Sequence, residues 1–269
     1  MTSNPKAPVL FISHGAPTFA IEPGKLGRLL NALGKRLHDV RAILVVSPHW
    51  QTSGVSVMTT IAPETIHDFG GFPSALYELQ YPVKGAPEIA SEVCTLLMQA
   101  GWTVALDDRR GLDHGAWVPL MHLLPDGDVP VFQVSMPHDL NAATAYKLGQ
   151  ALASVRAYGV MILASGSMTH NLHEFKKLDS APEKYVEEFT QWVRQTVLHA
   201  DAQSMMAYRR LAPHAERAHP TDEHFLPLLV ALGATAPGEQ PELLEGGIEH
   251  GMLSMESYAW GELRTKRLE

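Results

Sequence analysis

Cysteine is nearly absent from this chain, because Cys94 is the single one among 269 residues. An internal disulfide bond is therefore excluded, and so are the zinc sites that need several thiolate ligands. Cys94 lies in an apolar stretch with helical spacing, where a lone thiol usually behaves as a small buried hydrophobic residue. Any metal site in this protein must rely mainly on nitrogen and oxygen ligands.

Long apolar runs and basic patches are also lacking. No segment reaches the roughly 18 apolar residues of a membrane span, and the first apolar run is too short for a signal-peptide core. The chain has 21 Lys and Arg against 29 Asp and Glu, a net charge of -8, which argues against a nucleic-acid surface. We expect a cytoplasmic protein that binds neither membrane nor nucleic acid. The sequence leaves its oligomeric state open.

No repeat, low-complexity tract or linker divides the chain, so we predict that residues 1–269 form one domain. Short apolar strands alternate with amphipathic helices, which predicts an α/β fold with a central, mainly parallel or mixed sheet flanked by helices on both faces. Strands are expected at Val9–Ile12, Ala42–Val46, Thr103–Leu106, Pro130–Ser135, Val160–Ala164 and, late in the chain, within Gly247–Tyr258. Helices are expected at Lys25–Leu37, Pro87–Ala100, Gly115–Leu123, Leu140–Tyr158, Pro182–Leu198 and Asp222–Leu232.

Histidine is abundant, with 14 copies, and three of them follow predicted strands: His14, His49 and His170. The carboxyl ends of strands in an open α/β sheet meet at one edge, so these imidazoles should converge. Gly15 and Pro48 are expected to end their strands sharply. A fourth imidazole, on His224, should lie in the first turn of the helix that Thr221 would cap. Neutral imidazole is the commonest metal ligand, so the pattern predicts a transition-metal site. Each histidine taken alone has a structural explanation, but the repeated position argues for ligation.

Two loops carry further candidates. The segment from Thr65 to Pro73 combines His67, Phe69 and Phe72 with two glycines, which fits either an aromatic pocket wall or an ordinary turn with buried rings. In the second loop, His114 follows Asp113, so Asp113 or a backbone group would fix its tautomer. His114 is then a proton-transfer or substrate-contacting group.

Taken in order, these motifs form a recognisable set. They are Ser13 to Pro17, Ser47 to Trp50, His67 to Pro73, Leu112 to Trp117, Ser165 to Leu172 and His219 to Leu228. Together they closely resemble the DOPA-dioxygenase-type branch of the class III extradiol ring-cleaving dioxygenases, from about Pro8 to Met255. The resemblance implies an extradiol-dioxygenase-like catalytic domain in which a non-haem metal and O2 open the ring of a small aromatic diol, a catechol.

The same resemblance assigns roles. It implies that His14 and His49 hold the metal, that His224 supplies another ligand, and that His170 is an acid/base or, with zinc bound, a fourth ligand. His114 would be a second catalytic candidate that lines the substrate pocket. Substrate contacts from His67, Phe69 and Phe72 follow from their aromatic character.

One departure concerns His224, since much of the wider extradiol group has a carboxylate as its third ligand. Glu223 is a poor substitute, because adjacent residues on a helix do not share a face. The activity requires Fe2+, but a nitrogen-only site would let Zn2+ compete and be the ion found bound. Three interpretations follow: an iron-dependent extradiol dioxygenase, a zinc-dependent hydrolase, or a non-enzymatic metal-binding interaction protein on the same fold. The imidazoles of His114 and His170 favour catalysis.

Overall fold

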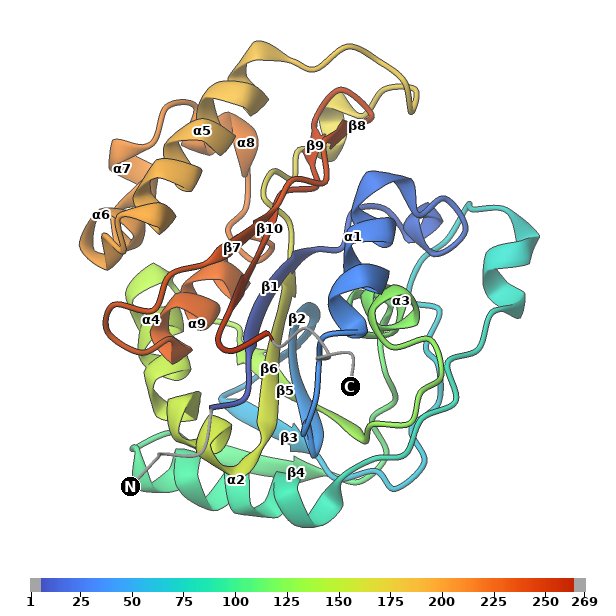
Figure 1. Ribbon diagram of the computed structural model, residues 1–269, viewed down its shortest axis with the longest axis vertical. Coiled ribbons are helices and arrows are strands. Elements are labelled where there is room, and N and C mark those ends of the chain that lie inside the picture. Colours follow the sequence, from blue (N-terminus) through green and yellow to red (C-terminus); the bar gives the residue numbers. More distant parts are fainter. Residues whose placement is uncertain (1–5, 264–269) are drawn as a thin grey trace, which may run out of the picture.

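The computed structural model describes residues 6–263, and its centre is one eight-stranded sheet (Figure 1). The strands lie in the order β4 (Val104–Asp107), β3 (Val55–Met58), β5 (Val131–Pro137), β2 (Ala42–Thr52), β6 (Val160–Gly166), β1 (Val9–Ser13), β10 (Ser257–Trp260) and β7 (Glu242–Leu244). Two short strands, β8 (Ile248–Glu249) and β9 (Leu253–Ser254), pair separately.

The sheet is mixed, as predicted. Parallel pairs join β1 to β6, β2 to β6, β2 to β5 and β3 to β4, whereas β3–β5, β1–β10 and β10–β7 are antiparallel. Strands β1 and β6 are buried along their whole length, which suits the unbroken apolar runs of central parallel strands. The late segment 247–258 holds the short pair β8–β9 and the start of β10, all antiparallel, so its expected strand is confirmed in part.

Helices cover both faces of the sheet. They are α1 (Gly24–Gly34), α2 (Pro87–Gln99), α3 (His114–Leu123), α4 (Ala142–Leu152), α5 (Lys184–Leu198), α6 (Ala202–Met206), α7 (Tyr208–Leu211), α8 (Ala215–Ala218) and α9 (Leu226–Ala234). Helices α4 and α9 lie on one side of the sheet and α1 and α3 on the other (Figure 1). This arrangement confirms the predicted fold class. Cys94 is buried in α2, as expected.

Several short elements were not predicted: β3, β7 and α6 to α8. They are three to five residues long, too short to show a clear hydrophobic period. The helix expected over residues 140–158 is an α-helix only to Leu152 and continues as a 3-10 helix over Ala153–Tyr158.

The prediction for the helix that carries His224 was wrong at its start. Helix α9 begins at Leu226, with Pro227 in its first turn, where the missing proline N–H costs nothing. The Thr221 hydroxyl does not cap the helix and instead donates to the Glu223 carboxylate at 2.9 Å. His224 therefore lies in the turn before the helix, held there by the preceding chain.

The expected strand exits were half right. Gly15 lies just after the end of β1 and has a φ of 64°, in the left-handed region that favours glycine. Pro48, however, does not end β2, which continues to Thr52. The register against β5 shifts between Val46 and Gln51, and this irregularity accommodates the proline. His49 thus sits inside a distorted strand.

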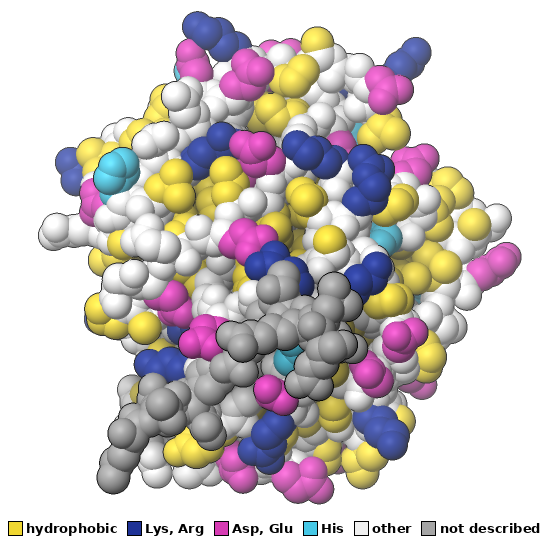
Figure 2. Space-filling model, viewed as in Figure 1, with side chains coloured by type: hydrophobic (Ala, Val, Ile, Leu, Met, Phe, Trp, Pro, Cys, Tyr) yellow, Lys and Arg dark blue, Asp and Glu magenta, His cyan; other side chains and the backbone are white. Residues whose placement is uncertain are grey.

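The surface is mixed in charge. Acidic and basic side chains are interspersed on the face in Figure 2, with hydrophobic ones between them. Within residues 6–263, no helix is both long and apolar enough to cross a membrane.

Candidate metal centre and active site

Three neighbouring strands deliver the three strand-end histidines. Strand β6 lies between β2 and β1, and its Ala164 and Gly166 pair with Val46 and Ser13 in register. His14 follows Ser13 directly, and its backbone N–H donates to the Gly166 carbonyl at 2.9 Å. The edge predicted from the sequence therefore exists, with His14, His49 and His170 on adjacent chain segments.

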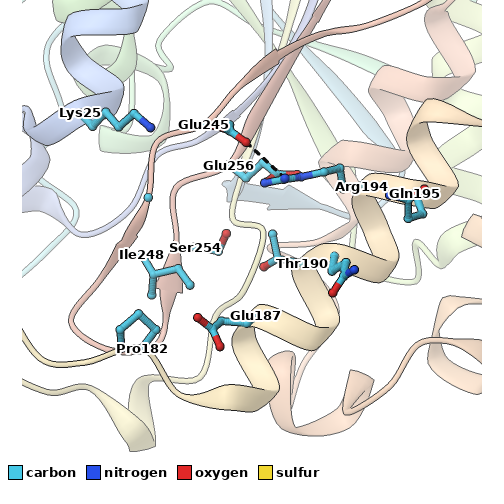
Figure 3. Close-up of a pocket in the computed structure, with 12 residues that line it drawn as sticks. Lys25, Pro182, Glu187, Thr190, Arg194, Gln195, Glu245, Ile248, Ser254 and Glu256 are labelled. Atoms are coloured by element: carbon cyan, nitrogen blue, oxygen red, sulfur yellow. Dashed lines mark hydrogen bonds and ion pairs between the residues drawn. The ribbon is translucent and has the colours of Figure 1, made fainter.

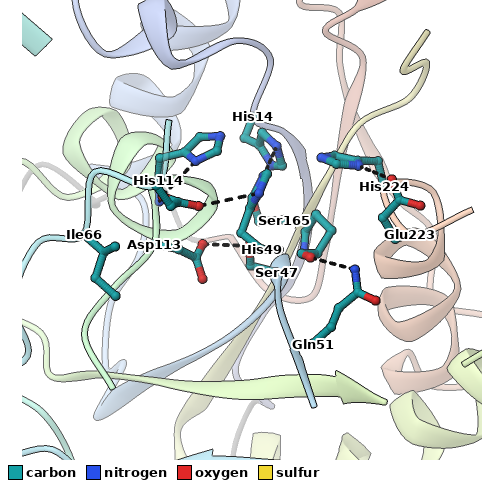
Figure 4. Close-up of polar contacts among 12 residues, drawn as sticks. His14, Ser47, His49, Gln51, Ile66, Asp113, His114, Ser165, Glu223 and His224 are labelled. Atoms are coloured by element: carbon teal, nitrogen blue, oxygen red, sulfur yellow. Dashed lines mark hydrogen bonds and ion pairs between the residues drawn. The ribbon is translucent and has the colours of Figure 1, made fainter. Parts of the chain in front are cut away.

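A cluster of imidazole nitrogens forms at this edge (Figure 4). Nε2 of His14 lies 3.2 Å from Nε2 of His49, and one nitrogen from each of His14, His49 and His224 lies within 4.8 Å of the others. Two nitrogens bound to one tetrahedral zinc ion at about 2.1 Å are roughly 3.4 Å apart, close to the observed spacing. The geometry suits a single small cation among the three rings.

Each of these rings has an oxygen beside its other nitrogen. Nδ1 of His14 lies 2.9 Å from the Ser165 hydroxyl, and Nδ1 of His224 lies 3.1 Å from the Glu223 carboxylate. Nδ1 of His49 lies 3.6 Å from the Asp68 carboxylate. A carboxylate can only accept, so it favours the tautomer with hydrogen on Nδ1 and leaves Nε2 with a lone pair.

His224 shows what the cluster lacks. Its Nε2 is buried and has no hydrogen-bond partner among residues 6–263. Buried polar atoms are nearly always satisfied, so an exception calls for an unseen partner. A cation held among the three rings would satisfy this nitrogen, so the residues fit a metal.

The electrostatics keep these rings neutral. Burial, reinforced by the neighbouring imidazoles, lowers the pKa of His14 and of His224 well below the usual value. Burial and the nearby His114 lower the pKa of His49 to about 4, although Asp113 and Asp68 oppose the shift. Neutral imidazole is the form that binds metal, so the cluster is ready for a cation at neutral pH.

His170 lies beside the cluster. Its ring stacks on that of His224, with centroids 3.6 Å apart and planes 8° from parallel. It shares a group of possible ligands with Glu223 and His224, and it does not belong to the group of three described above. Burial lowers the pKa of His170, and the Glu223 charge opposes that shift. The position is suited to proton transfer next to a metal.

His114 lies on the opposite side, at the start of α3, with its ring centroid 4.0 Å from that of His49. The expectation that Asp113 or a backbone group fixes its tautomer was wrong. Asp68 does so: its Oδ1 accepts from the backbone N–H of His114 at 2.9 Å and lies 3.0 Å from Nδ1. Burial raises the pKa of Asp68, but the His114 hydrogen bonds and the nearby His49 outweigh it and lower that pKa to about 2.

Asp113 is the centre of a buried hydrogen-bond network. Its fully buried carboxylate accepts from the Ser47 hydroxyl at 2.7 Å, from Gln133 at 2.8 Å and from Arg110 at 3.0 Å. The Ser47 hydroxyl also accepts from the backbone N–H of His49, and Arg110 donates to the backbone carbonyl of His49. The network therefore holds the backbone of His49 at both ends within the distorted part of β2.

The loop from Thr65 to Pro73, with its two phenylalanines, packs against His114. The Phe69 ring lies 5.6 Å from those of both His114 and Phe72, and 5.8 Å from that of His67. His67 points its Nε2 to the carbonyl of Leu79 at 3.0 Å. Phe69 is thus the ring that adjoins the histidine cluster, with Phe72 and His67 behind it.

A separate hollow of about 450 Å³ lies between α5 and the β8–β10 region (Figure 3). None of the predicted site residues lines it. Its Arg194 is held by ion pairs to Glu245 and Glu256, so its charge is compensated within the protein. We place the functional site at the histidine cluster.

The sequence reasoning missed the residues that orient the ligands: Ser165, Asp68 and the partner role of Glu223. Two signals were present. Asp68 stands directly after His67 in a loop otherwise rich in glycine and phenylalanine, and Glu223 precedes His224. Carboxylates beside histidines are typical outer partners of metal sites.

The chain is similar to known proteins along most of its length. The model of the family described as the catalytic LigB subunit of aromatic ring-opening dioxygenase matches residues 8–259. The "4,5-DOPA dioxygenase extradiol" of Beta vulgaris is 38% identical over 252 residues, 92% of this chain and 94% of that protein. The protein of the same name from Escherichia coli K12 is 38% identical over 263 residues, 96% of each chain. A crystal structure of an uncharacterized Escherichia coli K12 protein has a TM-score of 0.78 and 32% identity, covering 94% of this chain and 99% of that one.

Proposed function

The chain belongs to the family of the catalytic LigB subunit of aromatic ring-opening dioxygenases, and we propose that it is a metal-dependent extradiol dioxygenase that uses O2 to open the ring of a catechol. Its relatives named 4,5-DOPA dioxygenase extradiol support a substrate of the DOPA type. The observation that carries the proposal is the convergence of one ring nitrogen from each of His14, His49 and His224 between two further imidazoles.

In this proposal His14, His49 and His224 hold the metal through Nε2. Iron in its divalent state, when bound there, supplies the redox chemistry that O2 activation requires, and three ligands leave positions open for other molecules. Zinc also suits a nitrogen-only site, and it is redox-inert. We therefore propose Fe2+ as the ion of the active enzyme and Zn2+ as an ion that the site also binds.

His114 would act on the substrate. Because Asp68 holds hydrogen on its Nδ1, Nε2 of His114 is left as an acceptor for a phenolic hydroxyl. The ring of Phe69 beside it provides an aromatic wall, backed by Phe72 and His67. A flat aromatic diol would fit a site with these two features.

His170 is the proposed acid/base. It stacks on His224 without belonging to the three-histidine group, and an imidazole can both take and return a proton. Catechols must lose a proton on binding, and ring opening needs a proton returned. His170 and His114, on opposite sides of the cluster, would divide these two transfers.

The test is anaerobic reconstitution with Fe2+, followed by oxygen consumption and absorbance with catechol, carboxylated catechols and DOPA. We expect oxygen-dependent formation of a coloured, ring-opened semialdehyde. His138→Ala, which removes an exposed imidazole, serves as the control and should match the parent. No turnover in fully ferrous protein across the panel would overturn the proposal. Hydrolysis supported by zinc without oxygen would indicate a zinc-dependent hydrolase instead.

A further inference from the structure

One carboxylate serves two imidazoles in this site. Oδ1 of Asp68 accepts from the backbone N–H of His114 and faces its Nδ1, while Oδ2 faces Nδ1 of His49 at 3.6 Å. The three residues form a group of their own, with one possible ligand atom each within 4.8 Å of the others. The Asp68 side chain is only 23% exposed, although its loop lies at the surface.

We propose that Asp68 is a positioning residue that sets the tautomers of His49 and His114 together, one carboxylate oxygen for each ring. The inference rests on the proposed function in taking His49 as a metal ligand and His114 as a substrate contact. Neither ring has another oxygen at Nδ1 among the hydrogen bonds and ion pairs found for residues 6–263. Asp68 thus controls whether Nε2 of each ring carries a lone pair or a hydrogen.

The same carboxylate supplies negative charge to a ligand set that has none. A carboxylate beside Nδ1–H makes the opposite nitrogen a stronger donor to a metal. Glu223 does this for His224 through a hydrogen bond of 3.1 Å, and the Asp68 carboxylate, 3.6 Å from Nδ1 of His49, does so through its charge. The three histidines carry no negative charge themselves, but the carboxylates of Asp68 and Glu223 place two negative charges next to their rings.

An amide at position 68 should affect the tautomers of the two rings differently. In Asp68→Asn the amide oxygen must face His114, because the backbone N–H of His114 can only donate. The amide NH2 then faces Nδ1 of His49, which favours the tautomer with hydrogen on Nε2. His114 should keep its native tautomer, and His49 should lose its free lone pair toward the metal.

The experiment measures tautomers and metal affinity without using activity. Long-range proton–nitrogen NMR on chelator-treated, full-length protein reads which nitrogen of each histidine carries hydrogen, and competition with a chelator gives the zinc affinity. We expect hydrogen on Nδ1 of both His49 and His114 in the parent. Asp68→Asn should move it to Nε2 of His49 alone and weaken zinc binding by about 10- to 100-fold, the usual effect of losing such a partner.

Three comparison variants make the result specific. Asp68→Ala should remove the tautomer preference of both His49 and His114. Glu223→Gln should weaken zinc binding and change the tautomer of His224, while the tautomers of His49 and His114 stay native. Asp108→Asn removes an exposed carboxylate six residues before His114 and should change neither the tautomers nor zinc binding. Circular dichroism confirms that each variant is folded.

The outcomes are separable from those of the proposed function. Unchanged tautomers at His49 and His114, with a zinc Kd within about twofold of the parent, would overturn the role of Asp68 even in an active dioxygenase. Altered tautomers and weaker zinc binding would support it even if no variant or parent opened a catechol ring.

Discussion

A single methyl group at position 115 tests how closely the site is packed. Gly115 is the second residue of α3, and a Cβ there would lie 2.4 Å from the Ser47 hydroxyl and 2.9 Å from Cδ2 of His49. Cδ2 is bonded to Nε2, so a push on that carbon moves the atom that faces the metal. Gly115→Ala should therefore disturb both stability and metal binding.

The expected magnitude follows from the contacts. Overpacking costs about 1–3 kcal/mol, and displacing Ser47 breaks its 2.7 Å hydrogen bond to the buried Asp113 carboxylate, which costs about another 1.5–3 kcal/mol. Alanine gains at most about 1 kcal/mol over glycine in a helix. The free energy of unfolding should fall by about 1.5–6 kcal/mol. Zinc affinity should fall by at least about tenfold, because His49 is displaced.

Urea unfolding of the chelator-treated protein and zinc competition measure these two effects. Gly70→Ala is the control, since a Cβ there meets nothing within 4 Å and its φ is not left-handed; it should change stability by no more than about 0.5 kcal/mol. In Gly115→Ala combined with Ser47→Ala the shorter contact is removed, so the double variant should be less destabilised than the two single effects added. If Gly115→Ala unfolded and bound zinc like Gly70→Ala, the packing argument would be wrong.

Four further predictions concern the imidazoles. His14→Ala or His49→Ala should remove most bound zinc, measured by elemental analysis after desalting, whereas His138→Ala should not. His170→Ala should keep much of its metal while kcat falls by about 10² to 10⁴, the range for a lost acid/base; complete metal loss would make His170 a ligand. His114→Ala should leave metal content nearly intact and alter KM or kcat, and an unaffected enzyme would return His114 to a structural role. Metal-free protein should lose stability as the pH falls from about 6.5 to about 4, because the unfolded chain protonates His49 below about 6.5 while the folded protein does so only near 4. For this group the free energy of unfolding should drop by at most about 1.4 kcal/mol per pH unit. The loss should be fully reversed above about pH 6.5. Urea unfolding across that range checks the sign, and a stability that rises on acidification would contradict it.

The sheet edge and the histidine pattern were readable from the sequence. The predicted apolar runs end at Ile12, Val46 and Ala164, shortly before histidines, and parallel pairing of β1, β2 and β6 brings the ends of these runs together. Backbone hydrogen bonding imposes that alignment on any parallel sheet, whatever loops follow. The meeting of His14 with His49 was therefore a consequence of local pattern and general topology.

The prediction for His224 was right in place and wrong in local structure. Its motif indicated that it would join the others, and its nitrogen does lie within 4.8 Å of theirs. The helix start, however, is set by Pro227, and the turn that carries His224 is held by the carbonyl of Asp222. The turn geometry depends on hydrogen bonds within residues 222–226 that helix periodicity does not reveal.

Sequence by itself determined the residue types, the strand ends and the nitrogen-rich character of the site. Tertiary structure alone decided which oxygen orients which ring: Asp68, 46 residues from His114, takes the part expected of Asp113, which instead anchors the backbone of His49 through Ser47 and Arg110. The physical reason is range. Strand periodicity acts between residues two to four apart, whereas a hydrogen bond between loops depends on how the whole chain packs.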